Sequence, residues 1–289
     1  MTAAEGVVAV GVDVGATLAK LAIRAADGSL RCEFLPADAH AALAARVVES
    51  APESVGLSGC GAAAFERVLE LPAERFIEFE AWGAGSRALL AEQGIDPGEP
   101  YVLVSVGTGT SILRIAQGRV ERLGGTALGG GTVLGLGVAL TGCESHAELC
   151  DLARQGERGN VDLLVSHIYS PGEIALPGDV TAASFGNLAR WLSRGQAPAS
   201  GDPSHREDLA ASVMGLVGEN VALICCGLAG SAQTRRIVYA GATLVDNPVL
   251  LAILMGVSAS MQCEPIALDR GGYGGAVGAL VLAAGDESI

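Results

Sequence analysis

The sequence predicts an α/β protein made of two similar lobes, and three observations support this fold class. Strand-forming runs, separated by a turn of glycine and threonine and then by a second turn, begin near residue 7 and again near residue 101. Residues 95–100, with two prolines and a glycine, form a break between the two copies. The chain has 289 residues, of which 50% are hydrophobic, so each lobe can bury a core. Because two such patterns can arise by chance, the motifs at the turns are needed to decide.

Each copy is expected to begin with three strands and to continue with helices. Asp27-Gly28 makes the second turn of the first copy, and Gln117-Gly118 makes that of the second. Hydrophobic periodicity and strand propensity predict the first copy as strands over Val7–Val14 and residues 19–24, helices over 39–50, 61–70 and 79–93, and a strand over 54–57. They predict the second copy as strands over residues 101–106, 110–115 and 119–123, an apolar helix after 130, a buried helix over 213–229, a buried strand over 238–242 and a final helix after the glycine-rich residues 271–279.

Composition excludes several classes of function. The net charge of −14 argues against a nucleic-acid binder, because contacts to phosphate backbones need clustered lysine and arginine. The seven cysteines lack metal-ligand spacing and are interpreted as reduced, mostly buried thiols, so no zinc site is expected. The chain starts without a basic and apolar leader, and Glu219 and Asn220 interrupt its longest apolar window. We therefore expect a cytoplasmic protein with no membrane role.

The first turn carries groups that suit a phosphate ligand. Asp13 ends a strand, Gly15 and Ala16 are small enough for backbone amides to approach phosphate oxygens, and Thr17 and Lys20 follow. A carboxylate in this place can hold a hydrated magnesium ion. Taken alone, the turn fits an ordinary surface hairpin better than a phosphate site.

A second turn makes the combination specific. Residues 107–111, Gly-Thr-Gly-Thr-Ser, lie at the corresponding place in the second copy, so two facing turns could clamp a triphosphate between the lobes. The glycine-rich residues 124–132 lead into an apolar helix whose first amides could bind an anion, although a flexible loop is the alternative. No Walker A sequence and no dinucleotide-binding glycine motif occur.

The chain resembles the type II pantothenate kinases over nearly its whole length. The resemblance is carried by residues 11–20, 78–81, 105–111, 122–137, 156–163, 168–169 and 177–186, in the family's order. It implies a two-lobed, actin-like (ribonuclease H-like) ATPase fold with duplicated mixed sheets and an ATP cleft between a lobe of residues 1–97 and a lobe of residues 98–289. In such a fold the final helix can pack back on the first lobe. The implied reaction is ATP-dependent phosphorylation of pantothenate to 4'-phosphopantothenate, the first step of coenzyme A biosynthesis.

The resemblance also assigns roles to individual residues. Glu78 matches the family's catalytic carboxylate and is expected to take the proton of the pantothenate hydroxyl, with Glu80 as the competing candidate. Arg122 matches the arginine that binds the pantothenate carboxylate, and Ser105 and Thr108 are expected beside the same substrate. Without the resemblance, Glu78 would be interpreted as a surface carboxylate at a helix start.

ATP and Mg²⁺ are the implied cofactors, with Asp13 holding the metal through water. The residues expected at the nucleotide are Asp13, Gly15, Ala16, Thr17, Leu18, Lys20, Thr108, Gly130, Gly131, Thr132 and Gly241. Three positions depart from the pattern, because Ala16 stands where many relatives have glycine and His146 and Ala242 stand where a related nucleotide site has Tyr and Ser. A homodimer, and inhibition by coenzyme A or acyl-coenzyme A, are further implications of the resemblance.

Two other functions stay open at this point. A sugar or amino-sugar kinase of the same superfamily would share the phosphate turns but usually takes an aspartate as its base. A non-catalytic sensor of ATP or acyl-coenzyme A would keep the glycine turns without needing Glu78 and Arg122 together. The presence of both favours an enzyme.

Overall fold

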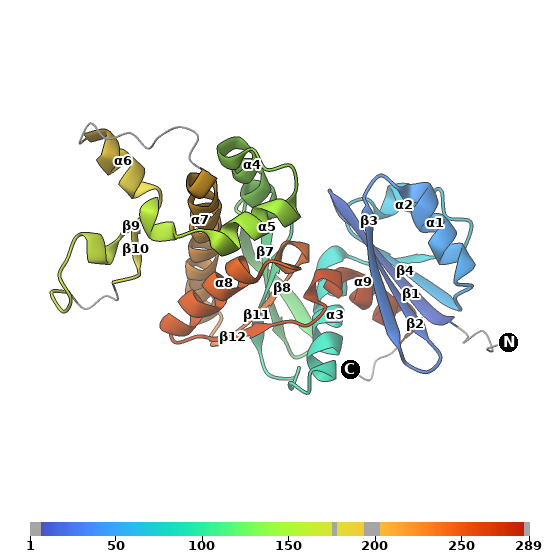
Figure 1. Cartoon of the computed structure of the whole chain (residues 1–289). Coiled ribbons are helices and arrows are strands. Elements are labelled where there is room, and N and C mark those ends of the chain that lie inside the picture. The colour runs from blue at the N-terminus through green and yellow to red at the C-terminus, as the bar shows by residue number, and fades with distance from the viewer. Residues whose placement is uncertain (1–6, 175–177, 194–202, 286–289) are drawn as a thin grey trace.

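The computed structural model describes residues 7–174, 178–193 and 203–285. Of the residues that carry the family resemblance, Pro177 lies outside this part. Two five-stranded sheets stand side by side, with helices between them and on their outer faces (Figure 1). A small arm with a two-stranded sheet extends from the second half of the chain.

The two five-stranded sheets have the same topology. Their orders are β3-β2-β1-β4-β5 and β8-β7-β6-β11-β12, in which an antiparallel meander is followed by two parallel strands. This repetition confirms the duplicated fold that the sequence predicts. The strands are β1 (Val7–Val14), β2 (Leu18–Ala25), β3 (Leu30–Pro36), β4 (Ser54–Ser58), β5 (Glu74–Arg75), β6 (Tyr101–Val106), β7 (Thr110–Ala116), β8 (Arg119–Thr126), β11 (Arg236–Ala240) and β12 (Glu264–Ala267).

Helices cover both faces of each sheet. The helices α1 and α2 lie on the outer side of the first sheet, α4, α5, α7 and α8 lie beside the second, and α3 and α9 lie between the sheets (Figure 1). They are α1 (His40–Glu49), α2 (Ala62–Glu66), α3 (Glu78–Glu92), α4 (Gly130–Thr141), α5 (His146–Gln155), α7 (Pro203–Ser231), α8 (Pro248–Ser260) and α9 (Gly274–Ala283). The arm contains β9 (Leu163–Leu164), β10 (Thr181–Ala183) and α6 (Gly186–Ser193), and short 3-10 turns are η1 (Arg158–Asn160), η2 (Val165–His167), η3 (Ala242–Leu244) and η4 (Gly271–Tyr273).

The two central helices join the lobes through a close crossing. A Cβ on Gly85 of α3 would lie 1.9 Å from the carbonyl oxygen of Gly274, and one on Gly278 of α9 would lie 1.6 Å from that of Ala81. Only glycine permits this approach of the two backbones. The helix α9, which ends the described chain, packs on β1 and β4 of the first sheet. One hydrophobic cluster therefore includes residues of both sheets and of α3 and α9.

The helix α7 is long and apolar enough over His205–Ser231 to cross a membrane, by length and composition alone. However, 72% of its apolar window is buried inside the protein, where α7 packs against α4, α5 and α8. This burial is typical of a core helix, which the sequence predicts for this segment.

Several predicted boundaries are wrong by two residues or more. The helix predicted over 213–229 is the longer α7 (Pro203–Ser231), and the strand predicted over 238–242 is β11 (Arg236–Ala240), after which Ala242 opens η3. The helix α2 ends at Glu66 rather than at residue 70, and a turn follows in which the Val68 and Leu69 N–H groups share the Phe65 carbonyl as acceptor. The strand β8 continues to Thr126 rather than stopping at residue 123, because a bulge opposite Ile112 lets its glycines keep pairing with β7.

Candidate active site

The end of β1 presents a carboxylate and an amine to each other. Asp13 is only 3% exposed, and its Oδ2 lies 3.2 Å from Nζ of Lys20, its register partner on β2. A Cβ on Gly15 would lie 2.8 Å from this amine, so the glycine leaves the room that Lys20 uses. Ala16 and Thr17 form the exposed tip of the turn, and Leu18 begins β2.

Two glycine backbones enclose the Asp13 carboxylate. A Cβ on Gly59 would lie 2.4 Å from Oδ1, and one on Gly275, in the first turn of α9, would lie 2.7 Å from Oδ2. Gly59 also has a φ of +88°, in the region that favours glycine. The sequence predicts a final helix at the glycine-rich residues 271–279, and the structure places Gly275, one of these glycines, against the first turn. The only sequence signal was the density of glycine at these two places.

We expect Gly275→Ala to disable the site while leaving the rest of the fold in place. The added methyl group would displace the Asp13 carboxylate, and we expect kcat/KM to fall about 10-fold to 100-fold, as for other losses of positioning around a charged group. Gly256→Ala is the control, because a Cβ on Gly256 of α8 meets nothing within 4 Å. Steady-state kinetics and melting temperatures of both variants measure this, and normal kinetics of Gly275→Ala would contradict it.

The second turn is held by hydrogen bonds from the start of α4. Within residues 107–109, the Gly107 N–H donates to the Gly109 carbonyl at 2.8 Å. The Gly130 N–H donates to the Gly107 carbonyl at 2.7 Å, and the Gly131 N–H donates to the Thr108 carbonyl at 2.9 Å. In this conformation the first amides of α4 therefore fix the turn rather than point outward. The turn is preorganised by the same glycines that the sequence analysis assigned to ATP.

Gly241 closes the second turn from the other side. Its φ is +115°, and a Cβ there would lie 2.2 Å from the carbonyl oxygen of Val106, so this position requires glycine. Thr243 of η3 donates from its hydroxyl to the Gly107 carbonyl at 2.9 Å, a contact that the sequence analysis missed. The Thr132 hydroxyl donates to the Ala127 carbonyl at 2.9 Å and so closes the loop before α4.

The two turns meet across the lobes. The hydroxyl oxygens of Thr17 and Thr108 lie 3.2 Å apart and form a hydrogen bond, although both side chains are exposed. The sequence predicts that the two turns face each other, and this contact brings them together. A ligand held by both turns would touch both lobes at once.

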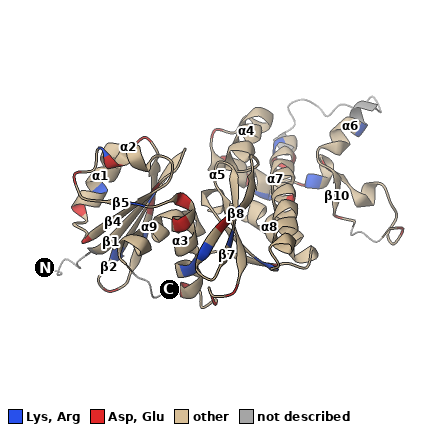
Figure 2. Cartoon of the chain, turned by 180° about the vertical axis from the view of Figure 1, so that it is seen from behind, with Lys and Arg blue, Asp and Glu red and all other residues tan. Residues whose placement is uncertain are grey.

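Glu78 begins α3 between the two sheets, where Figure 2 shows acidic residues. Its side chain is exposed to solvent, but nearby protein atoms displace enough water to raise the pKa of the carboxyl above its ordinary value. The negative charge of Asp13 raises this pKa further, and the positive charge of Lys20 opposes the rise. Glu78 thus shares one electrostatic site with both residues of the first turn. Glu80 is also exposed in the first turn of α3.

The expected substrate residues lie on the face of the second sheet that looks toward α3. Side chains alternate along a strand, so Ser105 shares the face of Leu103, which packs in the cluster between the sheets. By the same alternation Arg122 shares the face of Val120. Arg122 is exposed, and within the described part of the chain its guanidinium has no carboxylate partner.

His146 and Ala242, two of the three residues that differ from the family's pattern, lie near each other in the fold. Ala242 opens η3 directly after Gly241, and His146 opens α5. Burial lowers the pKa of His146, against the opposing charge of Asp246, which follows η3. His146 is therefore biased toward its neutral form, and its ring contacts the thiol of Cys150.

The magnesium ion that this fold implies can be tested against the residues present. In the described ranges, no group of three or more His, Cys, Asp and Glu side chains could form a metal cage. Mg²⁺ commonly needs no such cage, because one or two carboxylates with water and substrate phosphates complete its shell. The buried oxygen donors of Asp13 fit this requirement.

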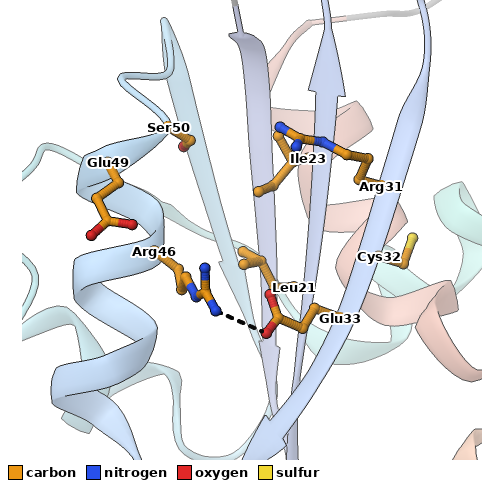
Figure 3. A pocket seen from close by; sticks show the side chains of 8 residues that line it. All are labelled: Leu21, Ile23, Arg31, Cys32, Glu33, Arg46, Glu49 and Ser50. Carbon is orange, nitrogen blue, oxygen red and sulfur yellow. Dashed lines mark ion pairs between the residues drawn. The ribbon is translucent and has the colours of Figure 1, made fainter.

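A hollow of about 410 Å³ lies away from these groups, between α1 and the meander of the first sheet (Figure 3). Its lining residues are Leu21, Ile23, Arg31, Cys32, Glu33, Arg46, Glu49 and Ser50, and none of them is a predicted site residue. Arg46 and Glu33 form an exposed ion pair across it, 3.7 Å apart.

Known proteins place the chain in a family. A sequence model of the Fumble family matches residues 72–282. The type II pantothenate kinase of Staphylococcus aureus (strain USA300) is 36% identical over 230 residues, which cover 80% of this chain and 83% of that protein. The chain belongs to the Fumble family of type II pantothenate kinases. The residues matched by the Fumble model include Glu78, Thr108, Arg122 and Gly241, whereas Asp13 and Lys20 precede the matched range.

Solved structures agree on the fold. The activator of the 2-hydroxyisocaproyl-CoA dehydratase from Clostridium difficile, with bound ADPNP, superposes with a TM-score of 0.62 and 16% identity, covering 97% of this chain and 95% of that one. A ROK family glucokinase from Streptomyces griseus, in complex with glucose and AMPPNP, gives 0.60 and 14%, covering 96% and 99%. At these identities the likeness concerns the fold alone, and it confirms the two-lobed, actin-like architecture.

Proposed function

We propose that this Fumble-family protein transfers the γ-phosphoryl group of ATP to the primary hydroxyl of pantothenate. Family membership carries the reaction and its substrates, because the chain matches type II pantothenate kinases over most of its length. The observation in the fold that supports it best is the meeting of the two turns beside Glu78, through the hydrogen bond of Thr17 and Thr108. Such an arrangement suits phosphoryl transfer, which depends mainly on positioning and charge neutralisation.

In this proposal each group has one task. The two turns hold the phosphates, with Lys20 facing their negative charge, and Glu78 accepts the proton of the attacking hydroxyl. Arg122, with its planar fork of donors, binds the pantothenate carboxylate, and Ser105 lies on the same side of the second sheet. Mg²⁺, held through water by Asp13, would neutralise the charge that develops on the phosphate oxygens.

The acceptor identifies the reaction. ADP release with MgATP is to be measured with pantothenate, pantetheine, N-acetylglucosamine and glucose. We expect pantothenate to support turnover and the two sugars not to. Turnover with a sugar but not with pantothenate would mean that the protein is a sugar kinase of the same superfamily. ATP binding without turnover on any acceptor would favour a non-catalytic sensor.

Arg122→Ala is expected to raise the KM for pantothenate with little change in kcat. A charged hydrogen bond that is equally strong in the ground and transition states acts on binding alone, and its loss costs about 1.5–3 kcal/mol, or roughly 10-fold to 100-fold in KM. Arg119→Ala is the matched control, because Arg119 is exposed on the same strand but, by alternation, on its other face. An unchanged KM in Arg122→Ala would remove Arg122 from the substrate site.

The acidic limb of the pH profile is expected to follow Glu78. A base must be deprotonated, and the pH profile of kcat/KM reports the free enzyme, so the raised pKa of Glu78 places the acidic loss of kcat/KM at a higher pH than an ordinary glutamate would. The raised pKa of Glu78 also affects the free energy of unfolding. The folded state binds the Glu78 proton more tightly than the unfolded state does, so the protein loses stability as the pH rises and Glu78 becomes charged. Glu78→Gln should therefore melt at a higher temperature than the parent at neutral pH, and this difference should vanish in acid. An acidic limb of kcat/KM at the pKa of an ordinary glutamate would contradict the assignment.

We also propose a homodimer, inhibition by coenzyme A or its thioesters, and a cytoplasmic location. The domain division at residues 97 and 98 belongs to the same proposal. Support for the dimer comes from exposed apolar side chains on two helices of the second lobe, Val138 and Leu140 on α4 and Leu223 and Ile224 on α7.

A further inference from the structure

Ser58 ends β4 directly beside the carboxylate of the first turn. It is the register partner of Asp13 on the adjacent parallel strand, and such partners point to the same face of a sheet. Two residues earlier, a Cβ on Gly56 would lie 2.0 Å from the carbonyl oxygen of Ala279, so this face of β4 looks toward α9. The Ser58 and Asp13 side chains therefore share the face between the lobes.

The Ser58 hydroxyl is buried and lacks a partner. The residue is 0% exposed, and its Oγ has no hydrogen bond to any residue that the structure describes. The large majority of buried side-chain polar atoms in proteins are hydrogen-bonded, so an unpaired hydroxyl beside the Asp13 carboxylate points to a partner from solvent or ligand. Asp13 cannot readily turn toward Ser58, because Gly59 and Gly275 enclose its oxygens and Lys20 holds Oδ2.

We propose that Ser58 is a positioning residue for the water that surrounds the Asp13 carboxylate, and thereby for the hydrated magnesium of MgATP. The Ser58 Oγ accepts a hydrogen bond from a water molecule whose other hydrogen goes to Asp13, so the two side chains together fix its place. This inference rests on the proposed use of MgATP. It adds a second oxygen group to a site where the sequence showed only one carboxylate.

The chain contains a matched control. Ser212, on α7, is also 0% exposed with an unpartnered Oγ, but it lies in the core of the second lobe rather than beside Asp13. Ser58→Ala and Ser212→Ala remove the same group from equally buried places. Ser58→Cys keeps nearly the shape of serine but substitutes a weak hydrogen-bonding group.

The proposal is tested by isothermal titration calorimetry of the parent protein, Ser58→Ala, Ser58→Cys and Ser212→Ala. Each protein is titrated with MgATP and, separately, with ATP in the presence of a chelator. We expect both Ser58 variants to bind MgATP about 10-fold more weakly or worse, the range found when residues that orient a metal's surroundings are lost. Binding of metal-free ATP should not change, and Ser212→Ala should bind both ligands as the parent does.

Unchanged MgATP affinity in the Ser58 variants, or equal weakening with and without metal, would overturn the proposal. Should Ser58→Ala not fold, Ser58→Cys decides the question by the same criteria. The titration needs no acceptor, so a failure of the parent protein to phosphorylate pantothenate would count against the proposed function and leave this result standing.

Discussion

Glu78→Gln is expected to lower kcat for pantothenate about 100-fold or more, the scale of a lost general base. Glutamine keeps the size of the side chain at the start of α3 but accepts no proton. Because Glu78 does not hold either turn, ATP affinity should stay near that of the parent protein. Single-turnover kinetics and ATP titration measure the two effects separately.

Glu80→Gln is the matched control for this change. Glu80 is an exposed glutamate in the same first turn of α3, two residues along the chain, and was the competing candidate from the sequence. No shift of kcat is expected in Glu80→Gln. If Glu80→Gln lost turnover and Glu78→Gln kept it, the two roles would have to be exchanged.

Asp13→Asn is expected to lower kcat/KM by about 100-fold or more, because the phosphates lose a charged group that organises their surroundings. The variant should also be less stable, by about 1–3 kcal/mol in the free energy of unfolding, because the Lys20 amine loses a charged hydrogen-bond partner in a largely buried place. Kinetics below the melting temperature and thermal unfolding separate the two losses.

The control for Asp13→Asn is Asp162→Asn. Asp162 is 0% exposed and pairs with Arg158 at 3.1 Å, in the network that joins the arm to α7. Both variants should therefore unfold more easily than the parent protein. Only Asp13→Asn should lose MgATP binding, and equal loss in both would mean that the effect of Asp13 is structural.

The sequence predicted the repeated meanders well because strand alternation and glycine turns are local signals. The strands β1 and β6 were placed with their observed bounds for this reason. The crossing of α3 and α9 was not predicted, because its contacts, such as Gly85 against Gly274, join residues far apart in the sequence. The sequence predicted a final helix at the glycine-rich residues 271–279 but not the helix that it crosses.

The sequence predicted the two turns and their facing arrangement but not most of the residues around them. Motifs identified the two turns, and the family resemblance assigned Glu78, whose environment no local pattern reveals. Ser58 was missed because a serine after a short strand has no distinguishing signal until the register with Asp13 is known. Thr243 was missed for the same reason, since only the fold brings it to the carbonyl of Gly107.

The most direct test of pantothenate phosphorylation by this protein is the transfer of labelled γ-phosphate from MgATP to pantothenate. The product is identified by mass spectrometry. The parent protein should form labelled 4'-phosphopantothenate, and Glu78→Gln should form it about 100-fold more slowly or worse. Absence of labelled product from a folded parent protein that binds MgATP would contradict the claim, and undiminished product from Glu78→Gln would contradict the role given to Glu78.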